Sequence, residues 1–274
     1  MRKLILLLFL LPCIAFGQVA DIDGNVYQTV VIGAQEWMAE NLRTTKYANG
    51  DFIPNVTNAN QWSNLTTGAW CHNSNDSLYE TIYGKLYNWY TVDDSRNVCP
   101  MGWHVPTDGG WTTLTDYLGG GVAGGKMKDV GTTQAGTGLW RSPNTGATNS
   151  SGFTGLPGGT RSTDGSFAAI VERYGYWWSS TENFTSYAFY RKLGKDYGHV
   201  VRSSLHKDDG FSVRCLNKTL IDTTATTITE PPTKPKELLT ITDLLGRTTH
   251  PTPNTLLFYI YDDGSVEKRV QLDR

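Results

Sequence analysis

The chain has 274 residues, enough for one large domain or for one domain with additional segments. Its formal net charge of −2 excludes a strongly basic nucleic-acid-binding protein, so we expect no nucleic-acid partner. Twenty-nine glycines, fourteen tyrosines and nine tryptophans accompany only 18% charged residues. This balance is more typical of an extracellular domain of strands and loops than of a helical cytosolic enzyme.

The N-terminus has the pattern of a secretory signal peptide. Residues 1–3 are basic at positions 2 and 3, and residues 4–16 form an apolar run that is too short to span a membrane. Ala15 and Gly17 supply small residues at the −3 and −1 positions of a cleavage site. We predict a signal peptide at residues 1–17, a mature chain that begins at Gln18, and no transmembrane segment after cleavage.

The cysteines fit an exported chain. Cys13 suggests a lipoprotein signal as an alternative, but Pro12 stands where a small residue would be expected, so soluble export is favoured. Three cysteines then remain, at positions 71, 99 and 215, and they allow at most one intramolecular disulfide. No C-x-x-C or H-x-x-x-H pair occurs, so we expect no zinc site.

The elements expected in the first half are strands and one clear helix. Residues 26–32 are β-branched and aromatic and follow the turn dipeptide Asp23-Gly24, which indicates a strand. Thr107 or Asp108 can cap a helix that ends at the glycines of positions 119 and 120. Its apolar residues fall on one face: Trp111, Leu114 and Leu118.

The second half of the sequence is predicted to form loops and strands. Residues 131–166 form a long loop whose isolated apolar residues indicate internal packing. Strands are predicted at 175–182, 187–191 and 210–215. In the first of these, Trp177 and Trp178 should face opposite sides of the sheet, one buried and the other more exposed. Residues 218–236 are rich in Thr and Pro and predict a linker, and residues 237–274 predict a small β-rich module that is marginally stable alone.

Several ordered blocks form a recognisable pattern. They are YGKLYNW at 83–89, CPMGWHVPT at 99–107, GFTGLPGGTR at 152–161, GYWWSSTE at 175–182 and GFSVRC at 210–215, together with residues 23–42. This pattern resembles the Fibrobacter succinogenes major paralogous domain. The resemblance covers about residues 20–217, so we assign residues 18–217 to this domain. It implies an α+β, C-type-lectin-like fold of short antiparallel strands, one main helix and long loops. A Cys99–Cys215 disulfide would suit the closure of such a fold.

The C-terminal residues contain three further blocks, DLLGR at 243–247, NTLLFYIYDDG at 254–264 and VEKRV at 266–270. These blocks resemble a sorting tail of the type IX secretion system of Bacteroidetes. The resemblance implies that residues 237–274 are recognised by the secretion machinery at the outer membrane. We therefore expect a protein that passes through the periplasm and is secreted or held at the cell surface. A small accessory β domain is the alternative.

The sequence does not favour an enzyme. Cys71 stands beside His72, but no Ser/His/Asp order or close pair of carboxylates supports catalysis, and we expect no catalytic residue, metal or cofactor. The tripeptides of calcium-dependent sugar lectins are absent, and Glu182-Asn183 is the nearest remnant.

We expect a non-catalytic binding module for a glycan or a surface protein. A structural or adhesive envelope protein without a small ligand is the alternative, and a lectin-fold enzyme is a weaker one. A ligand site is expected in the loops between Gly152 and Glu182. The candidate residues are Arg161, Asp164, Trp177, Trp178, Glu182 and Asn183.

Overall fold

The computed structural model describes residues 16–167, 171–217, 237–243, 246–252, 254–262 and 266–270. The chain divides into two compact units, Met1–Thr224 and Ala225–Arg274, each of which is described by itself. The predicted linker and nearly all of the predicted signal peptide lie outside the described residues. Phe16 and Gly17, the last two residues of that predicted signal peptide, belong to the first strand.

The first unit contains a five-stranded antiparallel sheet with the order β1-β2-β3-β10-β6. Its strands are β1 (Phe16–Ala20), β2 (Val26–Ile32), β3 (Gln35–Met38), β10 (Leu216–Asn217) and β6 (Trp103–His104). The predicted strand at 26–32 is confirmed, because buried and exposed residues alternate along most of β2. The strand at the end of the unit, β10, lies between β3 and β6, so the sheet joins the two ends of this unit.

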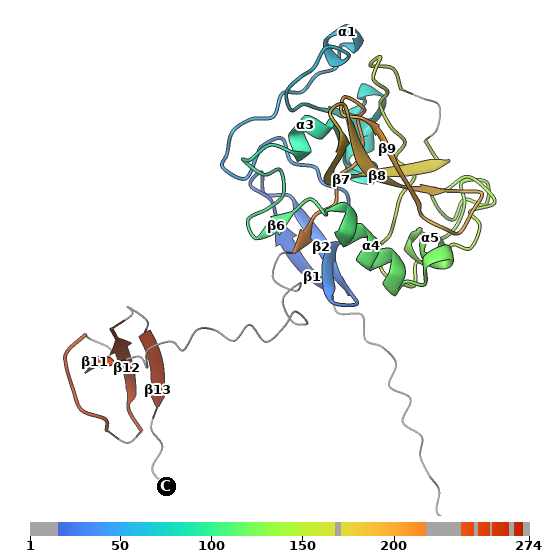
Figure 1. The fold of residues 1–274 in the computed structure, drawn as a ribbon. Helices are drawn as coiled ribbons and strands as arrows, with labels where there is room; N and C mark the ends of the chain where they lie inside the picture. Colours follow the sequence, from blue (N-terminus) through green and yellow to red (C-terminus); the bar gives the residue numbers. More distant parts are fainter. Residues whose placement is uncertain are drawn as a thin grey trace, which may run out of the picture. The chain divides into compact units, whose positions relative to one another are not determined.

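Two smaller sheets complete the strands of the first unit. One pairs β4 (Trp70–His72) with β5 (Lys85–Tyr87). The other has the order β7-β8-β9, with strands Tyr174–Phe184, Tyr187–Gly194 and Val201–His206 (Figure 1). The segment 210–215, predicted as a strand, forms isolated bridges instead: Phe211 pairs with Tyr87, and Ser212 with Trp177.

The helices are short. They are α1 (Ala59–Trp62), α2 (Glu80–Tyr83), α3 (Trp89–Val92), α4 (Asp108–Tyr117) and α5 (Ala123–Met127), with 3-10 turns at Asn73–Asn75, Ser77–Tyr79 and Gly120–Val122. The predicted helix is α4. The Thr107 hydroxyl accepts the Gly110 N–H at 3.0 Å and caps its first turn, and Gly119 follows it with φ +95°. No helix in the described ranges has the length and apolar character that a membrane crossing requires.

Both faces of β7 are covered at Trp177 and Trp178, which corrects the expected contrast between these two tryptophans. Trp177 packs among residues of β2, β3, α4 and β8, whereas Trp178 packs in a second core cluster with Tyr87 and Phe211. Both side chains are 0% exposed. Where a strand separates two hydrophobic cores, neither of its sides faces solvent, so alternation in that part of the strand does not predict exposure.

The expected α+β, C-type-lectin-like fold with one main helix is wrong. The protein is mostly β, with several small sheets. Although α4 is where the sequence predicts it, this ten-residue helix buries only Trp111 and Leu114 along its length, with Leu118 just after it. Side chains from strands and loops supply most of both cores, so the helix cannot be the element around which this unit packs.

The predicted disulfide is confirmed. Cys99 and Cys215 are bonded, with 5.9 Å between their Cα atoms and a sequence separation of 116. Cys99 precedes β6 and Cys215 directly precedes β10, and these two strands are paired. The covalent bond therefore fixes the point at which the end of the unit returns to its middle.

The second unit contains one antiparallel sheet with the order β11-β12-β13. The strands are Leu238–Thr242, Leu256–Tyr261 and Val266–Val270. Leu257 is 2% exposed, whereas Leu239, Val266 and Val270 are at least half exposed. With so little apolar surface buried among the described residues of this unit, they make only a small hydrophobic contribution to its stability.

Candidate functional site

Arg161, one of the predicted ligand-binding residues, is fully buried. Its Nε donates to the Gly165 carbonyl at 2.9 Å, its Nη1 to Val56 O at 2.5 Å and its Nη2 to Thr57 O at 2.8 Å. The guanidinium carbon lies 4.3 Å from the ring centroid of Trp62. These contacts bind loop segments to one another, and they leave no donor group facing solvent.

The two predicted tryptophans are also inaccessible. Trp177 Nε1 donates to Asn41 Oδ1 at 2.8 Å, and Trp178 Nε1 donates to the Tyr87 carbonyl at 2.8 Å. All nine tryptophans of the chain are buried, with Trp70 the most exposed at 7%. In this structure none of them offers a ring face to a ligand.

The other three predicted residues lie at the surface but do not meet in one cleft. Asp164 is in an exposed turn, where Oδ1 accepts the N–H and hydroxyl of Ser166. Glu182 and Asn183 are neighbours on β7, where Glu182 pairs with Lys207 at 2.6 Å. Of the six predicted residues, the structure thus brings only Glu182 and Asn183 together at the surface.

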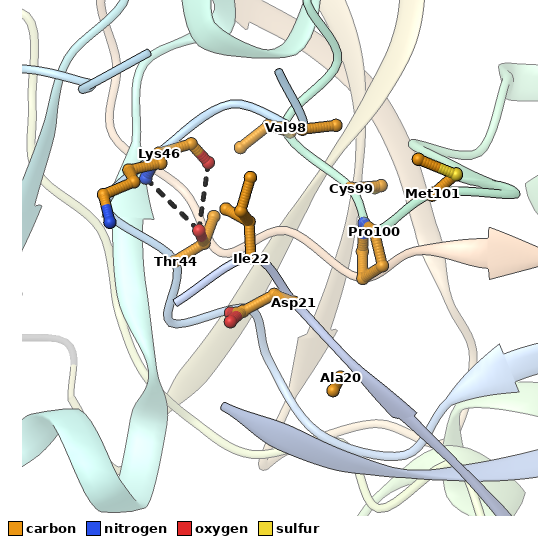
Figure 2. A pocket seen from close by; sticks show the side chains of 10 residues that line it. Ala20, Asp21, Ile22, Thr44, Lys46, Val98, Cys99, Pro100 and Met101 are labelled. Atoms are coloured by element: carbon orange, nitrogen blue, oxygen red, sulfur yellow. Dashed lines mark hydrogen bonds between the residues drawn. The ribbon is translucent and has the colours of Figure 1, made fainter. Parts of the chain in front are cut away.

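A pocket of about 210 Å³ lies beside the disulfide, at a place the sequence did not indicate (Figure 2). Its apolar lining comes from the end of β1 and the turn after it, and from the turn that contains Cys99. The apolar residues include Ala20, Ile22, Val98, Pro100 and Met101. Figure 2 shows that Asp21, Thr44 and Lys46 line the same pocket.

The polar groups of this pocket bond to the protein itself. Asp21 Oδ2 accepts the Tyr27 hydroxyl at 2.6 Å, and Oδ1 accepts the backbone N–H groups of Asp23 and Asn25. Thr44 Oγ1 bonds with the backbone of Lys46, as the dashed lines in Figure 2 show. Since these groups already have partners, a ligand here gains little from new hydrogen bonds and more from apolar contact.

An ion pair supports one side of the pocket. Lys46 Nζ lies 3.0 Å from Asp23 Oδ1, and the Thr45 N–H donates to Asp23 Oδ2 at 2.6 Å. Burial acts to raise the pKa of Asp23, but hydrogen bonds from Thr45 and Lys46 outweigh it and lower the pKa to about 2. The carboxylate is therefore ionised at neutral pH and holds Lys46 in place.

Large apolar side chains are exposed around this pocket. Met101 is 90% exposed and Ile22 47%, and both line the pocket; Phe52 is 75% exposed, and its ring centroid lies 5.1 Å from Lys46 Nζ. We name Ile22, Phe52 and Met101 the apolar rim. Met101 lies in a turn closed by the Trp103 N–H and the Pro100 carbonyl at 2.9 Å, so a rigid segment presents it.

The apolar rim was not predicted from the sequence, because amino-acid composition does not show which side chains are exposed to solvent. One signal was present at Met101. It is a large apolar residue between Pro100 and Gly102, in a turn where Gly102 has φ +83°. Such turns lie at the surface, so an apolar residue inside one is a candidate for contact with a partner.

Cys71 is a free, buried thiol. Burial raises its pKa to about 12, although the neighbouring Arg161 acts in the opposite direction. The thiol is therefore protonated near neutral pH, and the thiolate is the form that acts as a nucleophile. Within the described residues, no group of three or more His, Cys, Asp or Glu side chains could hold a metal ion.

The model of the Fibrobacter succinogenes major domain matches residues 30–217. The chain belongs to this family. No curated protein and no solved structure matches the chain.

The family region covers part of the pocket only. It begins within β2 and ends at β10, so it contains Phe52, Met101 and both disulfide cysteines. Ala20, Asp21 and Ile22 precede the matched range. The pocket thus combines residues of the family region with a segment that lies before it, and the second unit lies entirely outside the match.

Proposed function

We propose that this chain is an exported, non-catalytic binding module that recognises a protein partner at the bacterial surface or outside the cell. The signal-peptide pattern of residues 1–17, the Cys99–Cys215 disulfide and the likeness of residues 237–274 to a type IX sorting tail support export. In this proposal the tail interacts with the secretion machinery, and residues 18–217 carry the binding surface.

The apolar rim is the observation that carries the proposal. Side chains of Ile, Phe and Met each contribute about 1.5–3 kcal/mol when they are fully removed from water. Here three such side chains are exposed beside a pocket of about 210 Å³, and Met101 is almost fully solvated. A protein partner that covers the rim and inserts an apolar side chain into the pocket would gain this free energy.

The internal bonding of the polar lining favours a protein partner over a small polar ligand. Asp21 and Thr44 bond to other groups of the chain, and Lys46 pairs with Asp23. A glycan bound in this pocket would have to compete for those groups, whereas an apolar side chain would leave them undisturbed.

Affinity capture tests this proposal. The purified full chain, immobilised as bait, is exposed to envelope proteins of the native bacterium, and retained proteins are quantified. A Phe52→Ser, Met101→Ser variant should retain at most about a tenth of the partner, since two apolar contacts are lost. Phe184→Ser, which changes an exposed ring outside the rim, is the matched control and should retain the full amount.

Two results would overturn the proposal. The first is that no protein is retained above the level of resin without bait. The second is that the rim variant and the Phe184→Ser control retain the same proteins in equal amounts. Melting curves of the variants separate lost contact from lost folding.

A further inference from the structure

One face of the β7-β8-β9 sheet is only partly covered by a helix. Where α4 packs, Arg191 is buried, and its Nη1 lies 2.7 Å from Asp108 Oδ1. Arg202, on β9 opposite Arg191, also binds the Asp108 carboxylate, with Nη2 2.9 Å from Oδ2. Asp108 opens α4, so this ion cluster attaches the start of the helix to the sheet.

Beyond this ion cluster the same face carries aromatic rings. The strand register places Phe184 opposite Tyr187, and Tyr187 opposite His206, in one row across the three strands. Directly opposite residues share a face of a sheet. The rings of Tyr187 and His206 are 4.3 Å apart at an interplanar angle of 39°. Phe184 is 69% exposed.

A second row lies between the aromatic row and the ion cluster. Phe189 is opposite Ser204, and the guanidinium carbon of Arg202 lies 4.1 Å from the Phe189 ring centroid. Asn183 Nδ2 donates to Ser204 Oγ at 2.8 Å. An amide and a hydroxyl thus lie next to the rings: Ser204 is paired with Phe189, and Asn183 lies at the register shift of β7 between Glu182 and Phe184.

The charges near these rings are paired. Arg202, whose guanidinium packs on Phe189, is bound to Asp108 through both oxygens. An anionic ligand would therefore have to compete with Asp108 for Arg202. This arrangement favours a neutral ligand.

We propose that this surface, formed by Asn183, Phe184, Tyr187, Phe189, Ser204 and His206, binds a neutral saccharide. A sugar ring has an apolar C–H face that can pack on aromatic rings, and hydroxyl groups at its edge that can bond to an amide and a hydroxyl. The surface supplies both kinds of group within two neighbouring rows. The bond between Asn183 and Ser204 uses one amide N–H, so the second amide N–H, the amide oxygen and the Ser204 O–H remain as groups that can bond to a sugar. Two β-strand pairings keep it rigid, which reduces the entropy lost on binding.

This saccharide surface is separate from the apolar rim. It lies on the β7-β8-β9 sheet, whereas the pocket is lined by residues near β1 and the disulfide. It also differs in chemistry, because its rings alternate with hydrogen-bonding groups. The saccharide proposal therefore does not depend on the protein partner proposed above.

Affinity electrophoresis of the full chain tests the saccharide surface. Native gels would contain one of four neutral polysaccharides: xylan, mannan, mixed-linkage β-glucan or galactan. At least one should retard the protein. Phe184→Ser and Asn183→Ala should each weaken retardation about fivefold, since each removes one contact. Phe52→Ser, an equally exposed ring on the apolar rim, should leave retardation unchanged.

Absence of retardation in all four gels would overturn the saccharide proposal, as would equal retardation of the wild type and Phe184→Ser. Loss of protein capture in Phe184→Ser would also overturn it, because the surface would then contact a protein. Since Phe184 and Phe52 report on different surfaces, failure of one proposal is distinguishable from failure of the other. Unchanged melting temperatures would show that both variants are folded.

Discussion

Buried charged residues take structural roles throughout the first unit. Arg214 is 0% exposed; its Nε donates to Asn41 Oδ1 at 2.8 Å and its Nη2 to the Thr154 carbonyl at 2.8 Å. Lys128 donates to three backbone carbonyls, at 2.8, 2.9 and 3.0 Å. Such side chains are costly to bury without partners, so their full set of bonds explains why loops around them can be long and still ordered.

Asp209 is a buried carboxyl group for which the effect of burial on the pKa outweighs the effect of its hydrogen bonds. Burial, together with the charge of Asp208, raises its pKa from 3.8 to about 7, against hydrogen bonds from the backbone at Thr163 and His206. Between about pH 4 and 7 the folded protein therefore keeps a proton that the unfolded chain has released. The contribution of Asp209 to stability falls as the pH rises through this range and is least favourable above pH 7.

We predict that Asp209→Asn stabilises the protein more at pH 8 than at pH 5. The difference between variant and wild type in the free energy of unfolding should grow by about 3 kcal/mol over this range, because about two pH units separate pH 5 from the folded pKa of about 7 and each unit corresponds to about 1.4 kcal/mol. Urea denaturation at several pH values measures it. A difference that stays constant with pH would contradict the assigned titration.

At the scale of single elements, the sequence predicts the strands and helices that depend on residues close to one another in the chain. The β2 strand and the start of α4 follow from alternation and from a capping hydroxyl, which involve residues close in sequence. The burial of both Trp177 and Trp178 depends on which elements cover the two faces of β7. That information comes from tertiary packing and is absent from the strand itself.

Contacts between residues that are distant in sequence also explain why the six predicted site residues do not meet in one cleft. The sequence predicts Arg161 as a ligand-binding residue. In the structure its guanidinium donates hydrogen bonds to the carbonyls of Val56 and Thr57, which lie more than a hundred residues earlier in the chain. Conversely, the apolar rim combines Ile22, Phe52 and Met101 from three separate turns or loops. Nothing in their local patterns indicates that they share one surface.

The cap of α4 gives a prediction for one element. Thr107→Ala removes the hydroxyl that accepts the Gly110 N–H and should lower the free energy of unfolding by about 1 kcal/mol. Chemical denaturation measures the change. Thr113→Ala, at an exposed position inside α4, is the matched control and should change stability by no more than about 0.5 kcal/mol. Equal effects of the two changes would rule out a special role for the cap.

At the largest scale, that of a complete unit, the disulfide and the five-stranded sheet both connect distant parts of the first unit. The bond joins two residues with a sequence separation of 116, and in the chain-entropy model closing a loop of that size is worth about 5 kcal/mol. It also lies next to the pairing of β6 with β10, which joins distant parts of the first unit. The pocket and Met101 are built on this cross-linked region, so they rest on a rigid base.

The second unit gives a prediction about export. If residues 237–274 are a sorting tail, a chain truncated after residue 236 should enter the periplasm and remain there, while the full chain reaches the cell surface. Cell fractionation and surface labelling measure the two populations. Normal surface amounts of the truncated chain would exclude a sorting role and leave an accessory β module as the explanation.

Site-specific photo-crosslinking in the cells from which the chain comes tests whether the apolar rim binds a protein. Benzoylphenylalanine is placed at Met101, and in a control strain at Val130, an exposed apolar residue outside the rim. We predict a discrete crosslinked protein from position 101 and none of the same mass from position 130. No adduct at position 101, or the same adduct from both positions, would contradict the assignment of the apolar rim as a protein-binding surface.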